Sequence, residues 1–246
     1  MFEAKMSNPE IMVEAMKAAY ELVKDEVTFK IGEDGIILRA MDPANVAMVI
    51  MELTKKAFDE YQIVKESFIG INMERFMQVL KRSGKGDEMS MRISGGKMEI
   101  IYTGRGVRRF SLPLLALESG PRPEPNLSFS VKAEVQSTAL REAVEDTSVV
   151  SDAITIVAAN NELHLLAQGD LGDVETILKK GEGIEAIDIQ DKARSKYSIE
   201  YLKKLAKTKI GKNVKMMFKS DYPMMLQFSE PEIKIAFILA PRMDVE

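Results

Sequence analysis

The chain has 246 residues, which suffices for one large domain or for two domains of ordinary size. Apolar residues make up 46% of it, and it has one histidine, no cysteine and a formal net charge of −4. A packed core is therefore expected, disulfides and thiolate metal sites are excluded, and the residues needed for a zinc centre or a Ser-His-Asp triad are too few.

Two periodicities define the predicted elements. Apolar residues recur at every second position in the strands and at every third or fourth position in the helices. Pro9 suits the start of the first helix, and Asn72 is a plausible N-cap for the second. Strands dominate and helices occupy one face of the sheets, which predicts an α+β fold. In chain order, the pattern predicts a helix over about residues 9–24, strands at 27–31 and 36–40, a helix over about 72–82, strands at 89–93 and 98–102, a helix over about 135–148, strands at 154–156 and 163–167, a helix over about 198–209 and a strand at 233–237.

The two halves of the chain repeat one pattern. They align at a constant offset, so that Phe2 corresponds to Phe129, and the alignment holds without a gap over about 40 residues. The preserved order of apolar positions indicates two copies of one domain, at residues 1–117 and 127–246. Three of the nine prolines lie in the intervening residues 118–126, which predicts an extended and fairly stiff linker.

Five segments resemble one known family. They are Met1–Lys5, Arg39–Val46, Gly70–Met73, Leu80–Lys81 and Leu239–Arg242, and in this order they resemble the DNA sliding clamps of the proliferating cell nuclear antigen family, in its archaeal form. The resemblance covers essentially the whole chain. It implies a ring of three two-domain subunits, with antiparallel sheets outside and four helices lining the hole through which duplex DNA passes. It also implies a processivity factor of replication and repair, on which DNA polymerase, clamp loader, flap nuclease and ligase dock through short peptides.

The charges on the predicted helices are uneven. The net charge is −1 on the first helix, +2 on the second, −2 on the third and +3 on the fourth. We therefore expect the second and fourth helices to make most of the contact with DNA, and affinity for DNA that the ring does not enclose to be weak. In the first helix, Val13, Glu14 and Tyr20 hold outward positions where the family usually has basic residues. The candidates for DNA-facing side chains, opposite the buried stripes, are Lys17, Arg75, Lys81, Lys203 and Lys207.

Charges on these helices have a simpler interpretation, because charged side chains often only keep an outer helix face hydrated. The matched positions of Lys81 and Lys207 in the two copies favour contact with DNA. Glu142 and Asp146, four residues apart on one helix face, suggest ion pairing between subunits. Exposed ion pairs are worth at most ~1 kcal/mol each, so pairing of edge strands around 107–112 and 173–178 is expected as well. The candidate interface residues are Arg82, Lys85, Arg108, Arg109, Glu142, Asp146, Asp173 and Glu175.

Partner docking, by the same resemblance, uses an apolar pocket formed by three segments. Methionine suits such a pocket because its unbranched side chain repacks around different ligands, although methionine at strand spacing is more often a core residue. A peptide with an aromatic pair and an aliphatic anchor is expected to bind. The matching residues are Met41, Asn45, Val46, Met48, Leu127, Pro223, Ile238, Ala240 and Pro241.

Other functions are less consistent with the sequence. The glycine pairs at 84–86 and 104–106 do not continue as phosphate-binding loops and are typical of hairpin turns. His164 alternates with buried positions and is expected to face solvent, so we expect no enzyme, metal or cofactor. No apolar run approaches the roughly 20 residues of a membrane span and the opening residues lack a signal-peptide pattern, so we expect a cytoplasmic or nucleoid-associated protein. A subunit of a mixed ring, and an interaction scaffold that never encloses DNA, remain as alternatives.

Overall fold

The computed structural model describes residues 2–116, 120, 122–170 and 172–243. These residues form two compact units. The first unit contains residues 1–43, 49–124 and 229–235, and the second contains residues 44–48, 125–228 and 236–246. Within the described ranges, no helix is both long and apolar enough to span a membrane.

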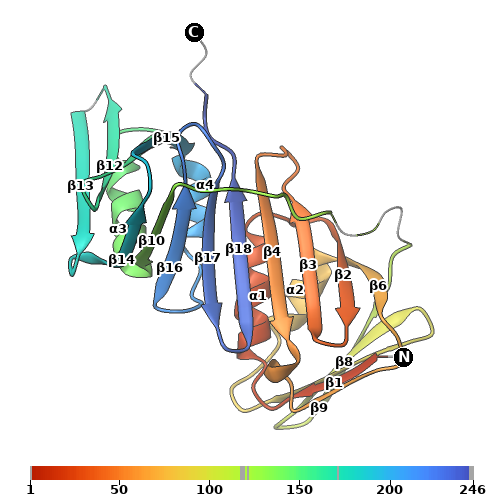
Figure 1. The fold of residues 1–246 in the computed structure, drawn as a ribbon. Helices are drawn as coiled ribbons and strands as arrows, with labels where there is room; N and C mark the ends of the chain where they lie inside the picture. Colours follow the sequence, from red (N-terminus) through yellow and green to blue (C-terminus); the bar gives the residue numbers. More distant parts are fainter. Residues whose placement is uncertain (1, 117–119, 121, 171, 244–246) are drawn as a thin grey trace. The chain divides into compact units, whose positions relative to one another are not determined.

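The first unit contains two antiparallel groups of strands. One group has the order β5-β1-β7-β8-β9, and β4, β3, β2 and β6 follow one another in the other. Helices α1 and α2 lie against the strands of this unit (Figure 1). Its elements are β1 (Phe2–Met6), α1 (Glu10–Tyr20), β2 (Glu26–Gly32), β3 (Gly35–Met41), β4 (Ala47–Thr54), a 3-10 turn (Lys55–Ala57), β5 (Glu60–Ile63), β6 (Ser67–Asn72), α2 (Met73–Leu80), β7 (Glu88–Ser94), β8 (Lys97–Thr103) and β9 (Val107–Pro113).

Most residues of the second unit's strands follow the order β15-β11-β12-β13-β14-β10-β16-β17-β18. Residues 229–235, at the end of β17 and the start of β18, belong to the first unit, and residues 47–48 of β4 belong to the second. Helices α3 and α4 cover one face of these strands (Figure 1). Its elements are β10 (Val131–Gln136), α3 (Ser137–Thr147), β11 (Ala153–Ala159), β12 (Glu162–Gly169), β13 (Gly172–Lys180), β14 (Gly183–Ile189), β15 (Ala193–Ser198), α4 (Ile199–Leu205), β16 (Asn213–Phe218), β17 (Met224–Glu230) and β18 (Ile233–Leu239).

The repeat predicted from the sequence recurs in the bounds of the elements. Adding 127 to the bounds of α1 gives Ser137–Thr147, which are the bounds of α3. The same addition to β2 gives Ala153–Ala159, the bounds of β11. Each unit therefore builds its strands and helices from corresponding positions, and the predicted α+β fold with a duplicated domain is confirmed.

The helices pack through the stripes that the sequence predicts. In α1, Met12, Ala15 and Met16 are buried, and in α2 the side chain of Asn72 accepts a hydrogen bond from the Arg75 N–H at 3.0 Å. This N-cap satisfies one of the amide groups that a helix start leaves unpaired. One predicted direction is wrong: Val13 is buried, with 9% of its surface exposed, so it does not hold an outward position on α1.

Candidate nucleic-acid interface

Five cationic side chains lie exposed on or just beyond the helices, opposite the buried stripes. All five are the DNA-facing candidates of the sequence, but their surroundings differ. The Lys17 ammonium pairs with Glu14 Oε1 at 2.5 Å, and Lys203 Nζ donates to Ser148 Oγ at 3.2 Å. The structure thus places the candidate cations at the surface of α1, α2 and α4; they are Lys17, Arg75, Lys81, Lys203 and Lys207.

Tyr20 is a feature of this surface whose role the sequence did not predict. It is the last residue of α1 and is half-buried, and the Nζ atoms of Lys24 and Lys81 each lie 5.8 Å from the centre of its ring. A cation at this range is attracted by the negative face of an aromatic ring. The spacing of Lys24 from Tyr20 fits one helical turn, but no sequence pattern connects Tyr20 with Lys81.

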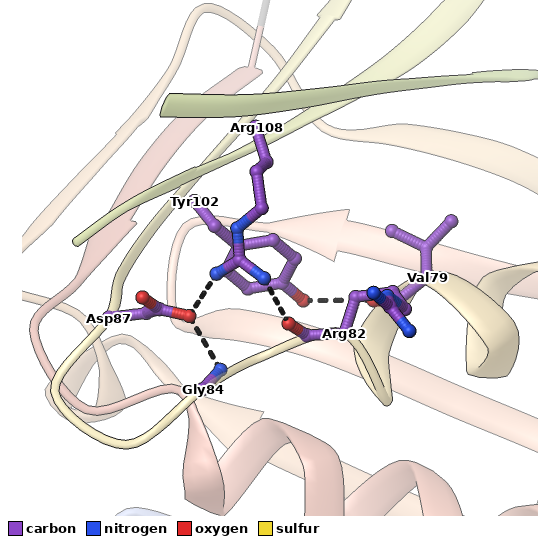
Figure 2. A network of polar contacts seen from close by, with 6 residues as sticks. All are labelled: Val79, Arg82, Gly84, Asp87, Tyr102 and Arg108. Carbon is purple, nitrogen blue, oxygen red and sulfur yellow. Dashed lines mark hydrogen bonds and ion pairs between the residues drawn. The ribbon is translucent and has the colours of Figure 1, made fainter. Parts of the chain in front are cut away.

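Arg108, on the edge strand β9, is half-buried, with 39% of its side chain exposed. Its guanidinium turns back into its own unit, where it pairs with the Asp87 carboxylate and donates to the Arg82 carbonyl at 2.7 Å (Figure 2). The guanidinium also lies 5.3 Å from the centre of the Tyr102 ring. Arg108 therefore holds the loop after α2 against the sheet.

Asp87 is the buried centre of this network, with 6% of its surface exposed. It accepts a hydrogen bond from the Gly84 N–H at 2.5 Å, and this bond, with the Arg108 pair, holds its pKa below the ordinary range although burial opposes the shift. A Cβ on Gly104 would clash with Asp87 Oδ1, so a larger residue there would have to displace this carboxylate. Beneath Arg108, burial raises the pKa of Tyr102 to about 12, and its hydroxyl donates to the Val79 carbonyl at 3.4 Å.

Asp87→Asn, which removes this charge, is expected to lower the free energy of unfolding at neutral pH. The free energy of unfolding of the variant is also expected to fall less steeply than that of the parent as the pH becomes acidic. A carboxyl whose folded-state pKa lies below the unfolded value of about 3.9 stabilises the fold above that value. This stabilisation is lost as the pH falls through the folded-state pKa. Guanidinium unfolding at a series of pH values measures it. Asp191→Asn, in an exposed loop, serves as control, and equal acid slopes for the parent and Asp87→Asn would contradict the assignment.

Strand β9 is the last strand of its group, so its outer edge has no partner strand among the described residues. Its side chains alternate: Arg108, Phe110 and Leu112 are half-buried, whereas Val107 and Arg109 are exposed. Successive side chains of a strand point to opposite faces. The adjacent arginines therefore point to opposite faces of β9, and a contact of either with Asp173 and Glu175 of another subunit stays a prediction.

Strand β13, in the second unit, also has an open edge. Its pairing with β14 joins only Lys179 and Lys180 to that strand, so within the described part of the chain the edge over 172–178 is unpaired. Asp173, Glu175 and Ile177 are exposed on one face, and Glu175 Oε1 lies 2.8 Å from His164 Nδ1. The side chain of His164 is 25% exposed, so the expected solvent-facing histidine is partly covered by its carboxylate neighbours.

The remaining interface candidates lie at the surface. Glu142 and Asp146 are exposed on one face of α3, and Arg82 and Lys85 are exposed in the loop that follows α2. The carbonyl of Arg82 is used within the unit by Arg108, whereas its guanidinium belongs to the exposed surface. These positions are compatible with a contact between subunits.

The docking candidates divide between the two units. Met41 belongs to the first unit and the other eight belong to the second, where the Ala240 N–H donates to the Val46 carbonyl at 2.9 Å. Met48 and Ile238 are buried, with 4% and 7% of their surfaces exposed. They therefore contribute little to the surface, and their part in a docking pocket stays a prediction. The surface of the second unit retains Asn45, Val46, Leu127, Pro223, Ala240 and Pro241.

The segment that begins the second unit is held by polar and aromatic contacts. Phe129 packs edge-on against Tyr222 with ring centres 6.3 Å apart, and Lys219 Nζ lies 3.8 Å from the centre of the Tyr222 ring. The same ammonium donates to Ser128 Oγ at 3.1 Å. These contacts fix the chain directly after Leu127, next to Pro223. In the described part of the linker, Glu124 pairs with Arg39 at 3.2 Å.

The sequence and the fold of this chain match those of known proteins. The family models for the "Proliferating cell nuclear antigen, N-terminal domain" and "C-terminal domain" match residues 1–105 and 124–243. A "DNA polymerase sliding clamp" of Thermococcus fumicolans is 35% identical over 249 residues, which cover 99% of each chain.

Solved structures agree with this match. The crystal structure of PCNA from Thermococcus kodakaraensis has a TM-score of 0.92 at 28% identity, covering 98% of this chain and 100% of that one. A structure of A. fulgidus PCNA with the C-terminal region of FEN-1 bound has a TM-score of 0.90 at 26% identity, and each chain is covered in full. The resemblance found in the sequence is confirmed, and the chain belongs to the proliferating cell nuclear antigen family of DNA polymerase sliding clamps.

Proposed function

We propose that three copies of this chain close into a ring around duplex DNA and tether DNA polymerase and other replication proteins to it. The observation that carries this proposal is the pair of open strand edges, β9 in the first unit and β13 in the second. An unpaired edge presents a row of N–H and C=O groups that another strand can satisfy. Head-to-tail joining of two different edges generates a ring where the rotation closes.

The side chains along the edges are suited to such a joint. Val107 on β9 and Ile177 on β13 are large apolar residues with 52% and 47% of their surfaces exposed. Arg109 carries the opposite charge to Asp173 and Glu175. Burying the apolar pair would stabilise the joint, and the charges would fix its register.

The cationic helix surfaces fit a ligand with a regular negative charge. Lysine contacts to phosphate carry no information about base sequence, which suits a protein that slides. We further propose that residues 1–117 and 127–246 act as the two clamp domains, joined by residues 118–126. The chain acts on DNA in the cell, and we expect association with the nucleoid and no catalytic activity of its own.

Partner docking is proposed for the second unit. The A. fulgidus relative binds the C-terminal region of FEN-1. By that similarity, short peptides of polymerase, clamp loader, nuclease and ligase would use the surface that includes Val46, Leu127 and Ala240.

Topological retention on DNA tests the encircling ring. The chain, loaded onto nicked circular DNA by a clamp loader with ATP, is expected to co-elute with the circle and to be released when one cut makes the DNA linear. Light scattering of the purified chain is expected to give three times its mass of 27.5 kDa. Retention that survives linearisation, or no retention of a chain that is a trimer by light scattering, would exclude encirclement. If the purified chain is a monomer and forms rings only with other chains, it is one subunit of a mixed ring.

A further inference from the structure

Tyr20 brings together two lysines from different parts of the first unit. Lys24 lies in the loop after α1, and Lys81 is the C-cap residue of α2. Each Nζ lies 5.8 Å from the centre of the Tyr20 ring, so the two nitrogens are no farther apart than twice that distance. One aromatic ring therefore gathers two cations at one place on the helix surface.

Neither cation forms an ion pair with another described residue. Lys24 and Lys81 are both exposed, and across the residues that the structure describes no carboxylate forms an ion pair with either. Asp25 follows Lys24 in the sequence, yet no ion pair joins them. Two lysines within the helices differ in this respect: Lys17 pairs with Glu14, and Lys204 pairs with a carboxylate at 2.7 Å.

Two unneutralised ammonium groups that lie close together favour an anion between or beside them. Along one DNA strand, successive phosphates are separated by about 3.4 Å of helix rise, so one phosphate or two neighbouring phosphates can lie within reach of two ammonium groups held at one ring. An isolated lysine loses side-chain entropy when it is fixed on a phosphate. A ring that already restrains both side chains reduces this loss before DNA arrives.

We propose that Tyr20, Lys24 and Lys81 form a seat for the phosphate backbone of DNA, in which the two lysines contact phosphate and Tyr20 is the positioning residue. The proposal rests on the function proposed above, because it requires α1 and α2 to face DNA. It assigns Lys24 and Tyr20 a role, and it places one of the strongest contacts beside the first helix, whose net charge of −1 predicts little contact.

Binding of the trimer to a short fluorescein-labelled duplex, measured by anisotropy over a series of salt concentrations, tests the seat. Lys24→Gln and Lys81→Gln are each expected to reduce the slope of log K against log salt by about 0.9 for each phosphate that the variant no longer neutralises. Tyr20→Leu, which retains both lysines, is expected to weaken binding about two- to fivefold. Tyr20→Phe retains the ring and is expected to bind like the parent.

The matched control is Lys97→Gln, which removes an exposed lysine at the start of β8, outside the proposed seat. Its affinity and slope are expected to equal those of the parent. The seat is refuted if Lys24→Gln and Lys81→Gln behave like this control. The positioning role is refuted if Tyr20→Leu binds like the parent, or if Tyr20→Phe weakens binding as much as Tyr20→Leu, which would make the hydroxyl the contact.

The two proposals fail in different ways. If the seat is wrong but the ring is right, every variant remains a trimer that is retained on circular DNA. Each variant then also binds the short duplex with the affinity of the parent. If the ring is wrong, the parent itself is not retained on circles. Tyr20→Leu changes a half-buried residue and can lower the melting temperature of the protein. The two lysine variants change exposed side chains only, so they still test the seat in that case.

Discussion

Arg109→Glu is expected to make the chain monomeric at concentrations where the parent is a trimer. Arg109 is exposed on β9, on the face opposite to the inward-turned Arg108, and in the proposed ring it meets Asp173 and Glu175 of the next subunit. Like charges placed together in an interface cost several kcal/mol, which weakens each joint by about a hundredfold or more. Light scattering during serial dilution measures the change.

A second substitution that restores opposite charges across the joint tests the contact more specifically. Arg109→Glu combined with Asp173→Arg or with Glu175→Arg is expected to recover the trimer, and the better of the two identifies the facing residue. Arg105→Glu makes the same change of charge in the exposed turn before β9 and is expected to leave the trimer intact. A trimer that tolerates Arg109→Glu, or that neither second substitution rescues, would contradict the proposed joint.

The periodic part of this fold could be predicted from the sequence. Burial at every second position of β2 and β3 follows from alternation alone, as in Val27, Phe29 and Ile31, and the stripes of α1 follow from helical spacing. Duplication made the prediction stronger, because corresponding positions had to agree. The predicted helices were nevertheless too long: α4 ends at Leu205, not near residue 209, since the pattern continues into a turn that closes with 3-10 hydrogen bonds such as Thr208 N–H to the Leu205 carbonyl.

Long-range contacts of single side chains could not be predicted in the same way. Alternation along β9 places Arg108 and Arg109 on opposite faces, but the pairing of Arg108 with the Asp87 carboxylate depends on where the loop after α2 lies. The contact of Tyr20 with Lys81 likewise depends on how α1 packs against α2. Met48 and Ile238 match the family's docking pocket in sequence, but the packing of their strands buries them. Such contacts join residues far apart in the chain, and no local period encodes them.

Leu127→Asp is expected to weaken binding of partner peptides by about a hundredfold or more. Leu127 is half-buried beside the ordered segment of Ser128 and Phe129, where the aliphatic anchor of a peptide would cover it. Covering an unpaired carboxylate with apolar groups costs several kcal/mol, and each 1.4 kcal/mol is tenfold in affinity. Calorimetry with a peptide that carries an aromatic pair and an aliphatic anchor measures the loss.

Leu127→Ala separates the removal of apolar surface from the introduction of charge and is expected to weaken binding about tenfold. Val64→Asp places the same carboxylate on a residue of the first unit that is 75% exposed, and it is expected to bind the peptide like the parent. A peptide that binds every variant equally would place the docking surface away from Leu127.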